Sequence, residues 1–214
     1  MSGFRSVVFD VDSTLAGIEG IDWLAARKAP AVAAKVAALT QRAMEGAITL
    51  DAVYGERLNV VMPSASDVDE LGTAYVEASA PGAKKVLAKL IEGGVDVHLV
   101  SGGLRPPVER LARELGVRSK NAHAVDVFFD ESGGYCGYDA NSPLTRQTGK
   151  REIVESLLLA RPILAVGDGM TDLEMKPAVD KFAAFTGYAS RPAVLEGADY
   201  TISRLEELFA LVLP

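Results

Sequence analysis

Short apolar runs of strand length alternate along this chain with stretches in which apolar residues recur at the helical period. The strand candidates are residues 5–9, 95–100, 163–166 and 182–185, and helix patterns occupy residues 83–92, the segment after Pro106-Pro107, and the segment from about Lys150. The last of these is expected to bury Ile153, Val154, Leu157 and Leu158. Strands that alternate with helices build a parallel sheet with helices on both faces. The sequence therefore predicts an α/β fold with a doubly wound parallel sheet.

Residues 16–78 interrupt this alternation, because helix-period apolar positions fill segments 21–28, 31–45, 50–61 and 65–79 without a strand between them. An insert placed directly after the first strand would sit above the carboxyl edge of the sheet as a lid. We therefore expect a catalytic core of residues 1–15 and 79–214 and a helical cap of residues 16–78. A β-hairpin is predicted at 125–138, where Ser132-Gly133-Gly134 separates two short runs.

Polar side chains follow three of the strand candidates, at the point where each strand is expected to end. Asp10 and Asp12 follow the first, Ser101 follows the second, and Asp168 follows the third. Ligands of open α/β sheets bind beyond the carboxyl ends of the strands. We expect these groups to meet at one edge of the sheet.

Four carboxylates would crowd this edge: Asp10, Asp12, Asp168 and Asp172. Two unit charges about 4 Å apart repel by about 4 kcal/mol at an effective dielectric constant of roughly 20. A bound cation would relieve that repulsion, and oxygen ligands suit Mg²⁺, which shares its shell with substrate phosphate. Taken singly, each aspartate is explained as well by a helix cap or a turn. Their expected convergence favours a magnesium site.

Ser101-Gly102-Gly103 and Lys150 supply groups that bind anions. Glycines let backbone amides approach a phosphate, and the start of the following helix favours negative charge. A tight strand-to-helix turn explains the same segment equally well when it is taken alone. Lys150 stands at the start of a helix, where a cation opposes the helix dipole and so suggests a partner elsewhere. With the acids, these groups could hold a phosphoryl group while one acid attacks it and a neighbour moves the proton.

These residues carry a family resemblance. The segments that resemble the four motifs of the haloacid dehalogenase superfamily of phosphatases are, in order, Asp10-Val11-Asp12-Ser13-Thr14, Ser101, Lys150 and Gly167-Asp168-Gly169-x-x-Asp172. Further segments are similar to the phosphoserine phosphatases of that superfamily, and they include Glu19-Gly20-Ile21-Asp22, Arg42-Ala43-Met44-Glu45-Gly46, Glu56-Arg57-Leu58 and Ser101-Gly102-Gly103-Leu104-Arg105. The similarity spans nearly the whole chain.

The resemblance implies a role for each core residue. Asp10 would be the nucleophile that forms an aspartyl phosphate. Asp12 would be the acid and base and would bind Mg²⁺ through its backbone carbonyl. Asp10 and Asp168 would be the other protein ligands of the metal, with Asp172 in support. The phosphate would be held by Ser101, Gly102, Gly103 and Lys150.

The resemblance also implies how the cap recognises substrate. Glu19 would face an ammonium group and Arg57 a carboxylate, which arginine grips with two parallel hydrogen bonds. Met44 would line the pocket and Thr171 would lie beside the substrate. Thr171 and Leu104 depart from the residues common in the family, which are Asn and Phe. From the residues alone, Glu19 and Arg57 are explained as well by a surface ion pair.

The expected function is Mg²⁺-dependent hydrolysis of O-phospho-L-serine to L-serine and phosphate, the last step of serine synthesis. Two alternatives share the fold: a phosphatase acting on another small phosphomonoester such as phosphothreonine, and a transferase that passes the phosphate to homoserine. A signalling receiver phosphorylated on Asp10 is a third. Receivers lack the long helical insert, and an acid at Asp12 would shorten the life of the phosphorylated state.

Composition and charge limit the binding partners and the cellular location that we expect. A net charge of −7 argues against nonspecific binding to nucleic acid. No apolar run approaches the roughly 20 residues of a membrane-spanning helix. The single Cys136 cannot form an internal disulfide, and a strand with its acid pair begins where a signal peptide would stand. We expect a cytoplasmic monomer or homodimer that binds a small phosphomonoester.

Overall fold

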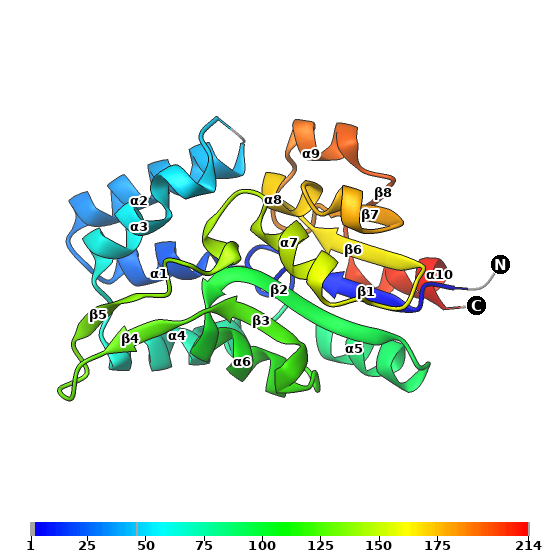
Figure 1. The fold of residues 1–214 in the computed structure, drawn as a ribbon, viewed down its shortest axis with the longest axis horizontal. Helices are drawn as coiled ribbons and strands as arrows, with labels where there is room; N and C mark the ends of the chain where they lie inside the picture. Colours follow the sequence, from blue (N-terminus) through cyan, green and yellow to red (C-terminus); the bar gives the residue numbers. More distant parts are fainter. Residues whose placement is uncertain (1–2, 46, 214) are drawn as a thin grey trace.

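The computed structural model describes residues 3–45 and 47–213, apart from the side chain of Met44. Its centre is a six-stranded parallel sheet with strand order β3-β2-β1-β6-β7-β8 (Figure 1). The strands are β1 (Ser6–Phe9), β2 (Asp96–Leu104), β3 (Ala122–Val125), β6 (Ile163–Gly167), β7 (Lys181–Phe185) and β8 (Tyr200–Ile202). All four residues of β1 are buried, as expected of a central strand in a sheet covered on both faces.

The order of the strands places a topological switch point beside β1. The chain adds β2 and β3 on one side of β1, then returns to add β6, β7 and β8 on the other side. At such a switch point the connections diverge and leave a crevice beyond the carboxyl ends of the strands. Asp10 directly follows β1, and its backbone amide donates to the carbonyl of Val166 in β6 at 2.9 Å. Asp10 therefore lies at the mouth of this crevice.

Helices cover both faces of the sheet, which confirms the predicted doubly wound α/β fold (Figure 1). One face is covered by α5 (Ala83–Glu92), α6 (Arg105–Glu114) and α10 (Leu208–Val212), and the other by α7 (Gly149–Ser156), α8 (Met170–Leu173) and α9 (Pro192–Gly197). Short 3₁₀ turns occupy Ser119–Asn121, Pro143–Thr145, Lys176–Ala178 and Leu205–Glu207. Among the described residues no helix has the length and hydropathy needed to cross a membrane.

Four helices stand between β1 and α5, where the sequence predicts the helical insert: α1 (Gly20–Ala26), α2 (Pro30–Met44), α3 (Leu50–Val61) and α4 (Ala65–Glu77). We call them the α1–α4 segment. Helix α1 packs against the other three. Helix α4 also packs closely on α6 of the core. The domain boundaries at residues 15/16 and 78/79 stay a prediction.

Several local details differ from the sequence prediction. Strands β3 and β8 have four and three residues, too few to give a clear apolar period. Strand β2 continues to Leu104, so Ser101 lies within it rather than at its end, and its pairing with β3 shifts register after Val100. Helix α7 ends at Ser156, which leaves Leu158 outside it and 89% exposed instead of buried. The predicted hairpin is present as β4 (Val127–Phe129) and β5 (Tyr135–Tyr138).

Candidate active site

Three buried carboxylates meet at the switch point. Asp10 follows β1, Asp168 follows β6, and Asp172 lies in α8 just beyond. One oxygen from each lies within 4.8 Å of the others, a separation that one cation can bridge. The hydroxyl of Thr14 donates to Asp10 Oδ2 and to Asp168 Oδ1, at 3.4 Å in each case. The predicted convergence of strand ends is therefore present in the fold.

Lys150 joins this acid cluster from the first turn of α7. Its Nζ donates to Asp10 Oδ1 at 2.5 Å and to Asp172 Oδ1 at 2.6 Å. The other oxygen of Asp172 accepts from the backbone amides of Asp168 and Gly169, at 3.0 and 2.9 Å. Residue 167 must be glycine, because a Cβ there would stand 2.2 Å from Asp172 Cγ. Asp172 thus orients Lys150 and the turn between β6 and α8.

The protonation of the cluster follows from burial and mutual repulsion. Burial and the neighbouring Asp172 raise the pKa of Asp10 to about 7, against the opposing effect of Lys150. Burial and the charge of Asp10 also hold the pKa of Asp168 well above its ordinary value. Burial alone would lower the pKa of Lys150, but Asp10 and Asp172 raise it, so the ammonium stays charged. Oxygen donors with excess negative charge fit a hard divalent cation such as Mg²⁺.

The side chain of Asp12 belongs to a different part of the site. Its Oδ1 accepts from the backbone amide of Gly20 at 3.1 Å and from the hydroxyl of Tyr75 at 2.5 Å. Burial and the charge of Glu19 raise the pKa of Asp12 well above its ordinary value. Asp12 is therefore poised to carry a proton, which suits an acid and base more than a carboxylate ligand.

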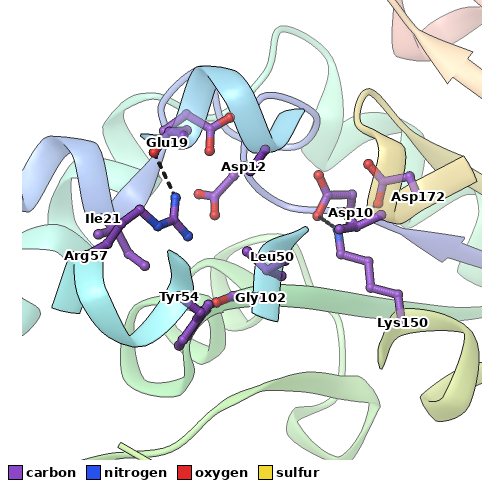
Figure 2. A pocket seen from close by; sticks show the side chains of 13 residues that line it. Asp10, Asp12, Glu19, Ile21, Leu50, Tyr54, Arg57, Gly102, Lys150 and Asp172 are labelled. Atoms are coloured by element: carbon purple, nitrogen blue, oxygen red, sulfur yellow. Dashed lines mark hydrogen bonds and ion pairs between the residues drawn. The ribbon is translucent and has the colours of Figure 1, made fainter. Parts of the chain in front are cut away.

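The acid cluster opens into a pocket formed jointly by core and helical segment. Figure 2 shows Asp10, Asp172 and Lys150 at one end and Glu19 and Arg57 at the other, with Asp12 between them. The side chains around the pocket are those of Asp10, Asp12, Glu19, Ile21, Thr40, Ala43, Leu50, Tyr54, Arg57, Lys150, Thr171 and Asp172, with the backbone of Gly102. Eight of these thirteen residues carry roles implied by the sequence resemblance.

Three of the predicted site residues, Asp168, Ser101 and Gly103, are not among the residues that line this pocket. Asp168 is buried beside Asp10 and forms an ion pair with Arg191 through its Oδ2. Ser101 is buried in β2, and its Oγ accepts from the amide of Gly103 at 2.9 Å. The side chain of Met44, predicted as a pocket residue, lies outside the described part of the chain.

The far end of the pocket holds buried charge. Arg57 is only 7% exposed, which excludes the surface ion pair considered from the sequence. Its Nη1 donates to Thr40 Oγ1 at 2.8 Å, and its Nε is buried with no partner among the described residues. Glu19 accepts from Ser13 Oγ at 2.6 Å, and burial raises the pKa of its carboxyl group. The guanidinium group of Arg57 and the carboxyl group of Glu19 thus line the pocket at the end opposite the acid cluster.

Comparison with known proteins shows which family this chain belongs to. A family model for haloacid dehalogenase-like hydrolases matches residues 7–176. The chain belongs to this family. A phosphoserine phosphatase of Bos taurus is 36% identical over 206 residues, which cover 95% of this chain and 91% of the relative. A phosphoserine phosphatase of Albidiferax ferrireducens is 32% identical over 226 residues, covering 98% of this chain and 91% of the relative.

A solved structure agrees with the fold over the whole chain. The structure described as a phospho-aspartyl intermediate analogue of phosphoserine phosphatase superposes with a TM-score of 0.83 at 26% identity, covering 99% of this chain and 100% of that one. The structure of a phosphoserine phosphohydrolase-like protein from Francisella tularensis gives a TM-score of 0.88 at 24% identity, which speaks for the fold alone. The expected membership in the haloacid dehalogenase family is confirmed.

Several residues of this hydrolase site are absent from the sequence prediction. Tyr75 and Arg191 lie far along the chain from the groups that they contact, and nothing local marks either one. Tyr54, in contrast, can be found from helix geometry. Tyr54 stands three residues before Arg57 in α3, and residues three apart share a helix face. Once Arg57 is placed at the pocket, the same face is expected to carry Tyr54 there.

Proposed function

We propose that this hydrolase is a magnesium-dependent phosphoserine phosphatase, which converts O-phospho-L-serine and water to L-serine and phosphate. The observation that carries the proposal is the division of one pocket into two charged ends. An acid cluster with a buried lysine occupies one end, and Arg57 with Glu19 occupies the other. A small molecule with a phosphate at one end and an amino acid at the other matches that division.

The donor set of the acid cluster suits Mg²⁺, with Asp10, Asp168 and the backbone carbonyl of Asp12 as the proposed protein ligands. When bound, the cation would balance negative charge on the phosphoryl oxygens. Lys150 contributes a second fixed positive charge at the same place, because it contacts Asp10 directly. Ser101 and Gly102 are the proposed further donors to the phosphate.

The chemistry proceeds in two displacements. A carboxylate oxygen of Asp10 attacks phosphorus, a bond from phosphorus to Asp10 forms, and the bond from phosphorus to the serine oxygen breaks. Asp12 gives its proton to the departing serine oxygen, which its raised pKa allows. Water then attacks phosphorus while Asp12 takes its proton, the bond to Asp10 breaks, and phosphate leaves. Asp10 and Asp12 return to their starting states.

The amino-acid end of the substrate would be held by the α1–α4 segment. The buried Arg57 Nε has no partner among the described residues, and a buried donor left unpaired costs about 1–3 kcal/mol. A carboxylate on the substrate would satisfy it with two parallel hydrogen bonds. Glu19 would face the substrate ammonium, with Thr171 and Met44 beside it. Two curated relatives that bear the name phosphoserine phosphatase support this assignment.

The proposed setting is the cytoplasm, where serine synthesis would use the product, and the proposed assembly is a monomer or homodimer. Cys136 is free and exposed, which suits a reducing compartment. Size-exclusion chromatography with light scattering would distinguish the two assemblies.

A screen of phosphate release tests the substrate. We expect O-phosphoserine to be turned over with kcat/KM at least tenfold above O-phosphothreonine, which has an added methyl group, and above phosphoglycolate, which lacks the carbon that bears the ammonium. Chelation should stop release and added Mg²⁺ should restore it. A better turnover of phosphoglycolate would contradict the amino-acid assignment. Formation of O-phosphohomoserine from added homoserine, in place of inorganic phosphate, would identify a transferase instead.

A further inference from the structure

Tyr54 in α3 connects the helical segment to the phosphate end of the pocket. It is 1% exposed, and its hydroxyl donates to the backbone carbonyl of Gly102 in β2 at 2.8 Å. Figure 2 shows Tyr54 and Gly102 side by side between the Arg57 end and the Lys150 end of the pocket. Burial raises the pKa of Tyr54, so its hydroxyl stays protonated and keeps its role as a donor.

The ring of Tyr54 is fixed by its neighbours. The Arg57 guanidinium carbon lies 5.9 Å from the centre of the ring, within the range of a cation–π contact. Tyr138 of the β4–β5 hairpin packs edge-on against the ring, with centres 5.2 Å apart and planes at 61°. Residue 55 has to be glycine for this approach, because a Cβ there would stand 2.6 Å from the Tyr138 hydroxyl oxygen. The ring therefore has little freedom to move.

The start of α3 has a second attachment to the core. The amide of Leu50 donates to Gln147 Oε1, and Asp51 Oδ2 accepts from the amide of Gln147, both at 3.2 Å. Helix α3 is thus held at residue 147 and at Gly102, on the side of the pocket that carries Lys150. Arg57 follows less than one turn after Tyr54. Its position is therefore set relative to the same backbone that lines the phosphate end.

We propose that Tyr54 is a positioning residue, whose hydrogen bond to Gly102 sets the span between Arg57 and the phosphate end and so selects the length of the substrate. The inference rests on the proposed function, because it needs a substrate that reaches both ends. Without the hydroxyl, α3 loses its direct bond to Gly102, and the span between the two ends is less strictly fixed. A substrate that contacts only the acid cluster would not sense this change.

Tyr54→Phe tests the proposal, since it removes the hydroxyl and keeps the ring. We expect kcat/KM for O-phosphoserine to fall 5- to 30-fold, while kcat/KM for ethyl phosphate, which has neither carboxylate nor amine, changes less than twofold. The ratio of O-phosphohomoserine to O-phosphoserine turnover should rise, because a longer substrate tolerates a looser span. Tyr135→Phe is the matched control: its buried hydroxyl has no partner among the described residues, so its loss should leave both activities unchanged.

A second variant separates ring from hydroxyl. Tyr54→Leu also removes the surface under Arg57, and we expect a larger loss on O-phosphoserine than in Tyr54→Phe, again with ethyl phosphate spared. Equal losses on both substrates, or no loss in either variant, would overturn the role of Tyr54 while the wild type still hydrolyses O-phosphoserine. A wild type inactive on O-phosphoserine would overturn the proposed function and this inference with it. Thermal melts of each variant confirm that folded protein is compared.

Discussion

The two ends of the pocket differ in how their charges are satisfied. At the core end, Lys150, Arg191 and backbone amides already bond the oxygens of the acid cluster. At the far end, Arg57 Nε is buried without a hydrogen-bond partner among the described residues. The core end is thus organised before a ligand binds, whereas the proposed substrate would complete the far end. In the proposed function, chemistry and recognition come from different parts of the chain.

The strands and helices that carry the two ends of the pocket also differ in how firmly they are held. The acid cluster stands at the ends of β1 and β6, two adjacent central strands whose side chains are buried. Glu19 and Arg57 stand at the start of α1 and in α3, and α3 is attached to the core by hydrogen bonds such as that from Tyr54 to Gly102. A variant at the core end should therefore affect every substrate, whereas a variant at the far end should affect substrates selectively.

The largest expected effect comes from Asp10→Asn, which removes the proposed nucleophile. Phosphate release should fall at least about 1,000-fold on O-phosphoserine and on ethyl phosphate alike, because no covalent intermediate can form. Steady-state release of phosphate measures it. Asp69→Asn is the control, since Asp69 is an acid 80% exposed on α4. Substantial turnover by Asp10→Asn would remove Asp10 as nucleophile.

Arg57→Ala tests the other end and should have the next largest effect. We expect kcat/KM for O-phosphoserine to fall about 100-fold through loss of the carboxylate contact, with less than about a threefold change for ethyl phosphate. Arg110→Ala, at an exposed arginine that contacts Asp69, controls for the loss of a positive charge. If both substrates suffer equally, the contrast between the two ends fails, and Arg57 acts on the fold or on catalysis.

The same contrast explains how far the sequence could predict the site. Core groups are predictable because short strands have a fixed direction and their ends meet at one edge, so Asp10, Lys150 and Asp168 could be brought together from motifs alone. Contacts between helices depend on crossing angles that no local pattern records. The contact between Thr40 in α2 and Arg57 in α3 is of this kind, and no motif predicts it. Leu158 was predicted as buried because the helical period continues past Ser156, where the helix itself ends.

Arg191 offers a further test of the core end of the pocket. It pairs with Asp168, a proposed metal ligand, so a bound metal would compete with the arginine for this carboxylate. Its Nη1 pairs with the carboxylate of Asp168 and also donates to the Asp168 carbonyl at 3.3 Å. Arg191→Gln should therefore bind Mg²⁺ more tightly, by about 5- to 20-fold, since the competing cation is gone. Isothermal titration at pH 8, above the pKa of about 7 for Asp10, measures this affinity without turnover. Unchanged or weaker binding would place Arg191 outside the metal competition.

The smallest expected effect concerns His123, which lies away from both ends of the pocket. Its titration changes the stability of the fold, and this change is the background for any pH dependence of the pocket. Burial, with the charges of His98 and Arg105, lowers the pKa of His123 from 6.5 to about 4. The ring of His98 stacks on it, and His98 Nε2 contacts Asp96 Oδ2 at 3.0 Å. Because the folded-state pKa lies below the unfolded one, protonation favours unfolding. The contribution is fully present above pH 6.5 and is lost as the pH falls toward 4.

His123→Gln removes this titration. Between pH 7 and pH 4.5 the free energy of unfolding of the wild type should fall by roughly 1–2 kcal/mol more than that of the variant, after discounting for the partly exposed ring. Urea unfolding at several pH values measures the difference. The raised pKa values of Asp10, Asp12 and Asp168 act in the opposite direction but are common to both proteins, so they cancel. Parallel stability curves would show that His123 titrates normally, and the acid sensitivity of the fold would then have to arise elsewhere.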